Sequence, residues 1–218
     1  MIKELKNAYK IIQYGLSVKK QLGFALMFAA IGIAVELATK GAQPVGAFYI
    51  VLSGLFIYQM IISSDVSTLI QSSPYKKKIQ CTYPLLAVIP WTYIAFTIIV
   101  VIHGVFANGA DPKIHAEYGA NIFLIGFLLF ITMAYFGISY KYFILSTVLM
   151  CCSVPIPMMG INILAHRFES VFSNYAACAA VAYVLLTLGS ILSWVLTRLL
   201  YKKDLSKLAF KGVLGKAD

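Results

Sequence analysis

Six blocks of apolar residues, each close to the length of a membrane-crossing helix, constrain this chain more than any other feature. A hydrocarbon layer of about 30 Å requires roughly 20 residues of α-helix. The blocks lie at about 22–38, 45–63, 82–106, 120–140, 142–160 and 176–200. None alternates polar and apolar residues as barrel strands do, and a backbone in lipid must satisfy its own hydrogen bonds. The blocks therefore predict an all-α membrane protein with six transmembrane helices.

The overall composition agrees with this prediction. The mean hydropathy is +0.84, and charged residues make up 12% of the chain, whereas soluble domains carry roughly 25%. The net charge is nevertheless +10. In a membrane protein, such a charge favours contact with anionic lipid headgroups over contact with nucleic acid.

The distribution of lysine and arginine predicts the orientation. With the N-terminus inside, Lys40, Lys113 and Arg167 fall on the outer side, and the other cationic residues fall on the inner side. The inner set comprises Lys3, Lys6, Lys10, Lys19, Lys20, Lys76, Lys77, Lys78, Lys141, Arg198, Lys202, Lys203, Lys207, Lys211 and Lys216. Cationic residues accumulate in cytoplasmic loops. We therefore expect a multi-pass protein of the plasma membrane with both termini in the cytoplasm.

Three regions follow from these patterns: an interfacial amphipathic helix at 1–20, a six-helix domain at 21–201 and a basic cytoplasmic tail at 202–218. In the first region, apolar residues recur at three- and four-residue steps between lysines, as in a helix lying in the membrane surface. These residues are Ile2, Leu5, Tyr9, Ile12 and Leu16. A solvated basic leader is the alternative, and no cleavable signal peptide is evident.

Residues with catalytic or ion-binding chemistry are sparse. The sequence has no nucleotide-binding loop and no metal-binding helix. We expect Glu36 near the outer end of the first span, and His103, His115 and His166 at or beyond the outer interface. Ionisable groups buried in a membrane mark proton and ion pathways. The sequence therefore predicts no catalytic residue, no metal site, no cofactor in this chain and no ion-coupled transport by the chain alone.

The cysteines suggest no further chemistry. Cys81, Cys151, Cys152 and Cys178 lie in or beside the predicted spans, and their spacing fits no zinc or haem motif. We expect them to be buried, inert thiols.

The loop after the second block has the pattern of a short cytoplasmic helix. Ser64 can cap it, Asp65 suits the positive end of its dipole, and Pro74 ends it. The predicted helix comprises Asp65, Val66, Ser67, Thr68, Leu69, Ile70 and Gln71, with Val66, Leu69 and Ile70 on one apolar face. Such a helix can fit a groove on a soluble partner. An ordinary polar loop with inner-side lysines is the alternative.

The order of these elements resembles the membrane subunit of type-2 ABC exporters, the ABC-2 permease family. That subunit has an N-terminal connecting helix, a coupling helix between spans two and three, and outer re-entrant helices between spans five and six. Pro155 and Pro157 interrupt the fifth block here, and His166, Arg167 and Glu169 follow in the outer segment. An ordinary helix end followed by an outer loop would give a similar sequence pattern, and it is the alternative to a re-entrant segment here. The stretch from Gln71 to Gln80, QSSPYKKKIQ, also looks like the corresponding loop of small permeases from Gram-positive bacteria.

The resemblance implies a function. Such a permease pairs with itself or with a sister permease and binds two cytoplasmic ATPase subunits, which hold ATP and Mg. The chain itself would then not be an enzyme. Its substrates would be peptides, such as toxins, lantibiotics or amphipathic antimicrobial peptides, exported from a bacterial cell. Candidate residues of the substrate path are Tyr49, Phe56, Tyr58, Met60, Phe143 and Met150. Each could equally face lipid or pack between helices.

Two other functions stay open on the sequence. One is the substrate-binding membrane subunit of an energy-coupling-factor vitamin importer, for which the small residues Ala30 and Ala34 could dock a separate transmembrane partner. The other is a membrane immunity or structural protein that transports nothing.

Overall fold

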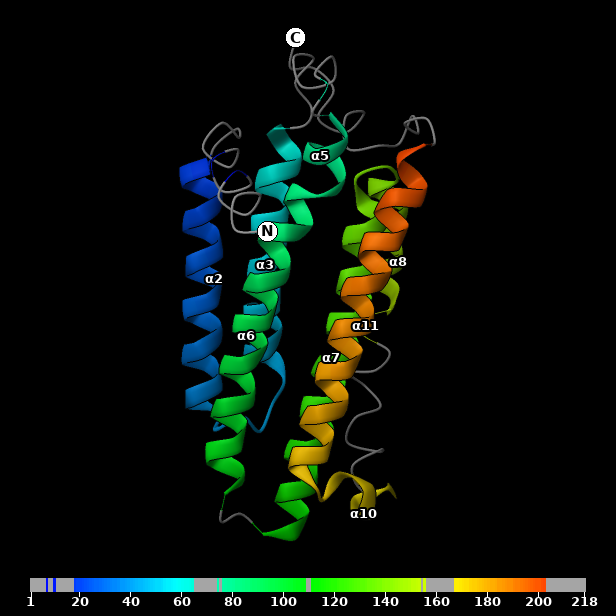
Figure 1. The fold of residues 1–218 in the computed structure, drawn as a ribbon. Coiled ribbons are helices and arrows are strands. Elements are labelled where there is room, and N and C mark those ends of the chain that lie inside the picture. The colour runs from blue at the N-terminus through cyan, green and yellow to red at the C-terminus, as the bar shows by residue number, and fades with distance from the viewer. Residues whose placement is uncertain are drawn as a thin grey trace.

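The computed structural model is an all-helical bundle (Figure 1). It describes residues 7, 10, 18–64, 74, 76–108, 111–153, 155 and 167–202, and within these ranges the chain forms no strand. The helices are α2 (Val18–Ala38), α3 (Val45–Ser64), α5 (Lys76–Cys81), α6 (Tyr83–Ala107), α7 (Pro112–Ser139), α8 (Phe143–Ser153), α10 (Glu169–Phe172) and α11 (Tyr175–Tyr201). The prediction of an all-α chain is confirmed for this part of the sequence.

Within the described residues, four helical stretches are long and apolar enough to cross a membrane. They are Lys19–Ala38, Lys76–Ala107, Lys113–Ser139 and Tyr175–Tyr201. The apolar part of α3 at Val45–Met60 and the whole of α8 are shorter. These lengths and compositions are compatible with a membrane protein, whereas the crossing of all six predicted spans stays a prediction.

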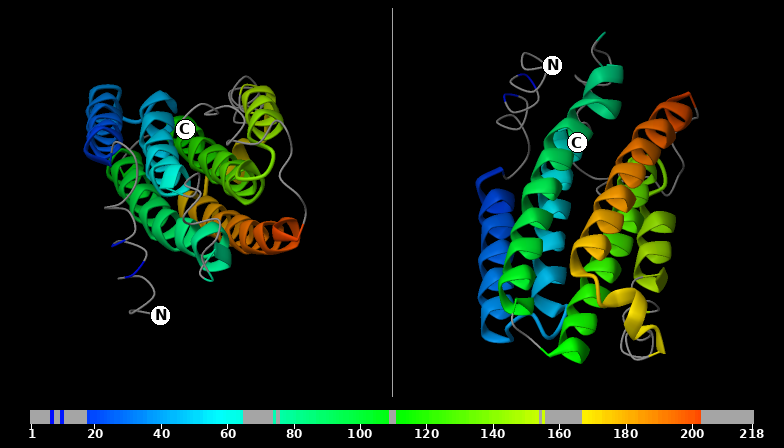
Figure 2. Two further views of the ribbon diagram at one scale, coloured as in Figure 1. Left: turned by 90° about the horizontal axis from the view of Figure 1, so that it is seen from above. Right: turned by 60° about the horizontal axis from the view of Figure 1, so that its bottom comes forward.

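Successive long helices run antiparallel and form two rows. Viewed along the bundle axis, α2, α3, α7 and α8 form one row, and α6 and α11 lie beside it in the second (Figure 2). The loop between α2 and α3 lies at one end of the bundle, together with the C-terminus of α6 and the N-termini of α7 and α11 (Figure 1). We call this the loop end. The opposite end, where α3 ends and α5 begins, is the α5 end.

The closest packing in the bundle is between α7 and α11, which pair along most of their length. A Cβ atom added at Gly126 of α7 would lie 2.5 Å from the Cβ of Ala182 on α11. One added at Gly137 would lie 3.0 Å from the Cα of Ser193. Small residues let helix backbones approach closely, which favours association where no hydrophobic effect acts between helices.

The α2–α3 pair is also packed closely at glycine residues. A Cβ at Gly32 would lie 2.7 Å from the carbonyl oxygen of Gly46, and a Cβ at Gly46 would lie 2.7 Å from that of Gly32. By contrast, Ala30 and Ala34, the small residues considered from the sequence, are exposed on α2. The internal contact is therefore made by two glycines.

Several predicted elements lie outside the described residues. They are the N-terminal amphipathic helix except for Asn7, Lys10 and its last three residues, the coupling helix at 65–71, Pro157, His166, and the tail after Lys202. These elements stay predictions.

The α7–α11 crossing leads to a prediction about stability. The Gly126→Val substitution should destabilise the protein by about 1–3 kcal/mol, the usual cost of overpacking a tight core. The reason is that its side chain has no space beside Ala182. Thermal unfolding of the purified protein in detergent measures the effect.

Gly23→Val in α2 is the matched control, because a Cβ there meets nothing within 4 Å. Equal stability of the two variants would contradict the packing account.

Candidate functional site

A fully buried pair of ionisable side chains lies at the loop end. Glu36 occupies the last turn of α2, and His103 lies near the C-terminus of α6. Their Oε2 and Nε2 atoms are 2.9 Å apart, and both side chains are 0% exposed. The backbone N–H of Ala47, in the first turn of α3, donates to the other carboxylate oxygen. The carboxylate of Glu36 therefore joins three helices.

The loop beside this pair is held by side chains of α7. The hydroxyl of Tyr118 donates to the carbonyl oxygen of Lys40 over 2.6 Å. The side-chain amide of Asn121 donates to the carbonyl oxygen of Gly41 over 3.4 Å. Both loop residues have positive φ, 53° at Lys40 and 69° at Gly41. We call the set formed by Glu36, Lys40, Gly41, His103, Tyr118 and Asn121 the loop clamp.

His103 lies inside α6, near its C-terminus, and its side chain is completely buried. Its place at the outer membrane interface stays a prediction. The pairing of Glu36 with His103 inside the bundle was not predicted from the sequence. A signal existed in the sequence: Glu36 and His103 end two apolar blocks that finish on the same side, so an acid and a base were available to pair. His115 lies on α7, with its ring 6.3 Å from that of Tyr175.

An apolar cavity of about 370 Å³ lies on another face, between α3, α7 and α8. It is lined by Phe48, Leu52, Leu55, Gln59, Tyr135, Phe143, Thr147, Met150, Cys151 and Pro155. Gln59 places an amide group in a wall that is otherwise apolar or aromatic, apart from the hydroxyl of Tyr135 and the thiol of Cys151. The hydroxyl of Thr147 donates to the carbonyl oxygen of Phe143 in its own helix.

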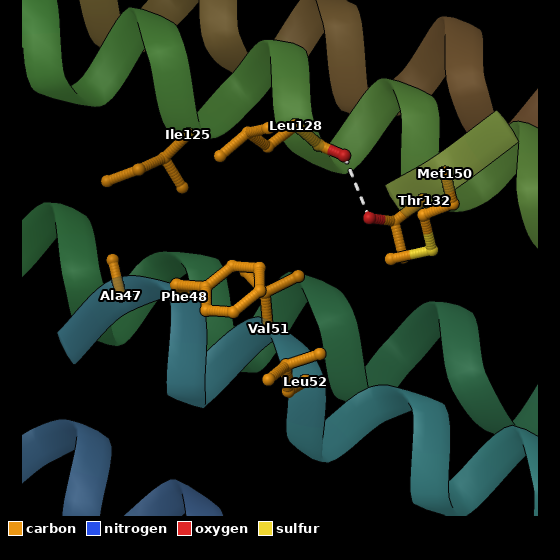
Figure 3. A pocket seen from close by; sticks show the side chains of 8 residues that line it. All are labelled: Ala47, Phe48, Val51, Leu52, Ile125, Leu128, Thr132 and Met150. Atoms are coloured by element: carbon orange, nitrogen blue, oxygen red, sulfur yellow. Dashed lines mark hydrogen bonds between the residues drawn. The ribbon is translucent and has the colours of Figure 1, made fainter. Parts of the chain in front are cut away.

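Two smaller cavities, of about 10 Å³ each, share lining residues with this pocket along α3. One extends toward the loop end and reaches Ala47, with Ile125 and Leu128 of α7 on its far side (Figure 3). In its wall the hydroxyl of Thr132 donates to the carbonyl oxygen of Leu128, so it adds no free polar group (Figure 3). The other extends toward the α5 end and reaches Ile62. We call the three cavities together the α3–α8 groove.

The groove contains half of the predicted substrate-path residues. Phe143 and Met150 line the central cavity, and Tyr58 lines the extension toward the α5 end. The hydroxyl of Tyr58 is engaged, since it donates to the carbonyl oxygen of Phe136 and accepts from Ser139. These three residues therefore lie in one region, between α3, α7 and α8.

The other three predicted residues lie elsewhere. Tyr49 and Phe56 pack on Phe28 of α2, with ring centroids 5.8 and 5.0 Å away. Met60 is buried in a cluster with Ala25, Ile57 and Ala87. The groove side of α3 carries residues that were not singled out from the sequence, namely Phe48, Leu52, Leu55 and Gln59. Their i, i+3 and i+4 spacing, ending on a glutamine in an apolar block, was the available signal.

The remaining predicted residues are placed as follows. Pro155 lines the central cavity, Arg167 is exposed, and Glu169 begins α10. Cys81 and Cys178 are buried, but Cys151 and Cys152 are exposed, so the expectation of four buried thiols is wrong for the last two. Among the described residues, no group of histidine, cysteine and carboxylate side chains could hold a metal ion.

Comparison with known proteins found no matching family model, no matching curated protein and no matching solved structure. The likeness to ABC-2 permeases therefore rests on the order of elements and on the loop at 71–80, and it stays a prediction.

The buried pair leads to a prediction about coupling. Glu36→Leu and His103→Leu should each destabilise the protein by about 1–3 kcal/mol, because each leaves at least one buried polar partner unsatisfied. The double variant should lose less than the sum of the two effects, since it removes both members of the pair and leaves only the N–H of Ala47 without its acceptor. Unfolding of the three variants in detergent provides the double-mutant cycle.

Effects that add to within about 0.5 kcal/mol would mean that the two residues do not interact, contrary to the 2.9 Å contact.

Proposed function

We propose that this chain is the permease subunit of an ATP-driven exporter of amphipathic peptides in a bacterial plasma membrane. Two permease copies, or this chain and a sister permease, would assemble with two cytoplasmic ATPase subunits that bind ATP and Mg. In this proposal all six apolar blocks cross the membrane. The α5 end faces the cytoplasm and the loop end faces outward.

The α3–α8 groove is the observation that carries the proposal. Its walls come from the second, fourth and fifth predicted spans and are mainly apolar and aromatic. The central cavity of about 370 Å³ has the size of a small-ligand site, about 300–1,000 Å³. An amphipathic peptide presents an apolar face with a few polar groups, and Gln59 supplies a matching polar point in an apolar wall.

The chemistry of the groove favours an external source of energy. Among the described residues that line it, none is acidic and none is histidine. The buried Glu36–His103 pair lies at the loop end, where neither residue lines any of the three cavities. Ion-driven carriers place ionisable groups on the substrate path. A separate ATPase is therefore the energy source we propose.

The place where that ATPase would act follows from the path of α3. This helix brings the chain to the α5 end at Ser64, directly before the predicted coupling helix at 65–71. Lys77 and Lys202, two members of the predicted basic inner rim, are exposed at this end. The coupling helix would therefore transmit movement of the ATPase to α3, which forms one wall of the groove.

The docking of the ATPase can be tested by co-purification. Leu69→Asp should abolish recovery of the ATPase with tagged permease, because it places a charge on the predicted apolar face of Val66, Leu69 and Ile70. Thr68→Asp is the matched control, since it adds the same charge on the opposite side of the same predicted helix. Equal recovery with both variants would contradict docking through this face.

The groove can be tested by filling it. Leu52→Trp should reduce transport several-fold without changing recovery of the ATPase, because its larger side chain occupies the central cavity. ATP-dependent uptake of a fluorescent cationic amphipathic peptide into inside-out vesicles provides the measurement.

Val148→Trp is the control, since Val148 is exposed on α8 and lines none of the cavities. Unchanged transport in Leu52→Trp would exclude the groove as the peptide path.

One observation favours the vitamin-importer alternative: Ala30 and Ala34 are exposed on α2 and free to meet another transmembrane chain. Native mass spectrometry of the chain purified alone separates the two functions. A retained small ligand would favour the importer, whereas an empty chain that recruits an ATPase favours the exporter. An empty chain that recruits no ATPase would favour the immunity or structural protein.

A further inference from the structure

We propose that the first turn of α5 and the last turns of α11 form a binding site for an anionic phospholipid. Lys77, Arg198 and Lys202 bind its phosphate-bearing headgroup, and the apolar side of α11 next to them binds its acyl chains. The proposal requires a membrane around the bundle, but it does not depend on peptide export. It goes beyond a general attraction of a basic chain to anionic lipids, because it assigns the lipid to one face of one helix.

The fold brings the two parts of this site together from distant places in the sequence. α5 and the C-terminal end of α11 lie at the same end of the bundle (Figure 1). Nζ of Lys77, in the first turn of α5, lies 5.8 Å from the ring centroid of Tyr201, the last residue of α11. The thiol of Cys81, at the other end of α5, donates to the carbonyl oxygen of Thr197 over 3.7 Å. The first turn of α5 therefore lies against the last turns of α11.

The cations of α11 share one side of the helix with two aromatic rings. Trp194, Arg198, Tyr201 and Lys202 follow one another at steps that place them on the same side. Cζ of Arg198 lies 5.4 Å from the ring centroid of Trp194, a cation–π contact. Arg198 and Lys202 are exposed, and both rings are partly exposed. Tryptophan and tyrosine gather at the level of lipid headgroups, so this end of α11 has the composition of a headgroup contact.

The positive charge of the site has no complement in the described part of the chain. A ring carries no net charge, so the contacts with Trp194 and Tyr201 neutralise neither cation. The acidic residues that the structure describes all lie at the loop end. They are Glu36, Asp111, Glu117 and Glu169. An anion that is not one of these carboxylates is therefore the complementary partner of Lys77, Arg198 and Lys202.

The helix dipole of α11 accounts for only part of this arrangement. The C-terminus of a helix carries a partial negative charge of about half an elementary charge, which stabilises cations in the last turn. Three full positive charges exceed this partial charge. The dipole also does not explain why Lys77 reaches this end from another helix. The surplus charge is available to a ligand.

The apolar side of α11 identifies that ligand as a lipid. Val184, Ile191 and Val195 lie on the same side as Arg198, toward the middle of the bundle, and they are 57, 55 and 46% exposed. A free phosphate ion would leave these side chains uncovered. An anionic phospholipid has its phosphate at the membrane surface and its apolar chains directly beneath, in the same order as the cations and the apolar residues of this face. Cations beside a membrane span attract such headgroups.

Tryptophan fluorescence can test the site, because the chain has two tryptophans. Trp91→Phe leaves Trp194, beside Arg198, as the reporter. The full chain is reconstituted in phosphatidylcholine vesicles in which a small fraction of the lipid carries bromine on its acyl chains, which quenches a tryptophan that it contacts. We expect brominated phosphatidylglycerol to quench Trp194 several-fold more than the same fraction of brominated phosphatidylcholine, because the anionic lipid accumulates at the site.

Removal of two cations should abolish this preference. Arg198→Gln combined with Lys202→Gln should make quenching by the two lipids equal. Lys19→Gln combined with Lys20→Gln is the matched control, since it removes the same charge from exposed positions of α2 at the same end of the bundle, and it should keep the preference. The two lipids are compared within each variant, so a change in the fluorescence of a variant cancels.

Equal quenching by the two lipids with Lys77, Arg198 and Lys202 intact would overturn the proposal, whether or not the other variants fold. A preference that survives Arg198→Gln with Lys202→Gln would also overturn it. An equal loss in the α2 control would mean general attraction to basic residues and no specific site. Excess inorganic phosphate should leave the preference unchanged, and its loss would identify a soluble anion as the ligand instead of a lipid.

Discussion

The bundle depends on close approach of helix backbones at glycine. In an apolar surrounding, side chains gain nothing by leaving water, so helices associate through van der Waals contact and a few polar links. Gly126 and Gly137 bring α7 against α11, and Gly32 and Gly46 bring α2 against α3. The rest of the fold follows from these two pairs, because α6 and α8 pack on surfaces that the pairs present.

The secondary structure could be predicted from the sequence because its cause is local. An apolar run of about 20 residues has few structural choices in lipid, and α2, α3, α6 and α11 lie within a few residues of the predicted blocks. The predicted and observed ends of a helix differ more where polar residues continue the helix beyond its apolar block. α7 begins at Pro112 rather than at 120, because the polar stretch containing Lys113 and Glu117 continues the helix beyond its apolar part.

The sites could be predicted only in part because they depend on distant contacts. Glu36 and His103 are 67 positions apart, and their pairing requires the α2–α3 pair to be packed against α6. The rotation of α3 likewise decides that Leu52 and Gln59 face the groove while Tyr49 and Phe56 face α2. An almost uniformly apolar helix gives little indication of its rotation, since every face is acceptable to lipid. The sequence could therefore indicate which residue types would line a substrate path, but not which of those residues face the groove.

The seam between α3 and α7 has one further consequence. These helices touch along little of their length. They are fastened near the α5 end by the bond from Tyr58 to Phe136, and α7 grips the α2–α3 loop through Tyr118 at the other end. These two hydrogen bonds lie toward opposite ends of the groove, so breaking one of them leaves the other in place. Loss of the Tyr118 contact would free the loop end of this seam from α7, while the bond from Tyr58 to Phe136 would still join α3 to α7 beside the groove.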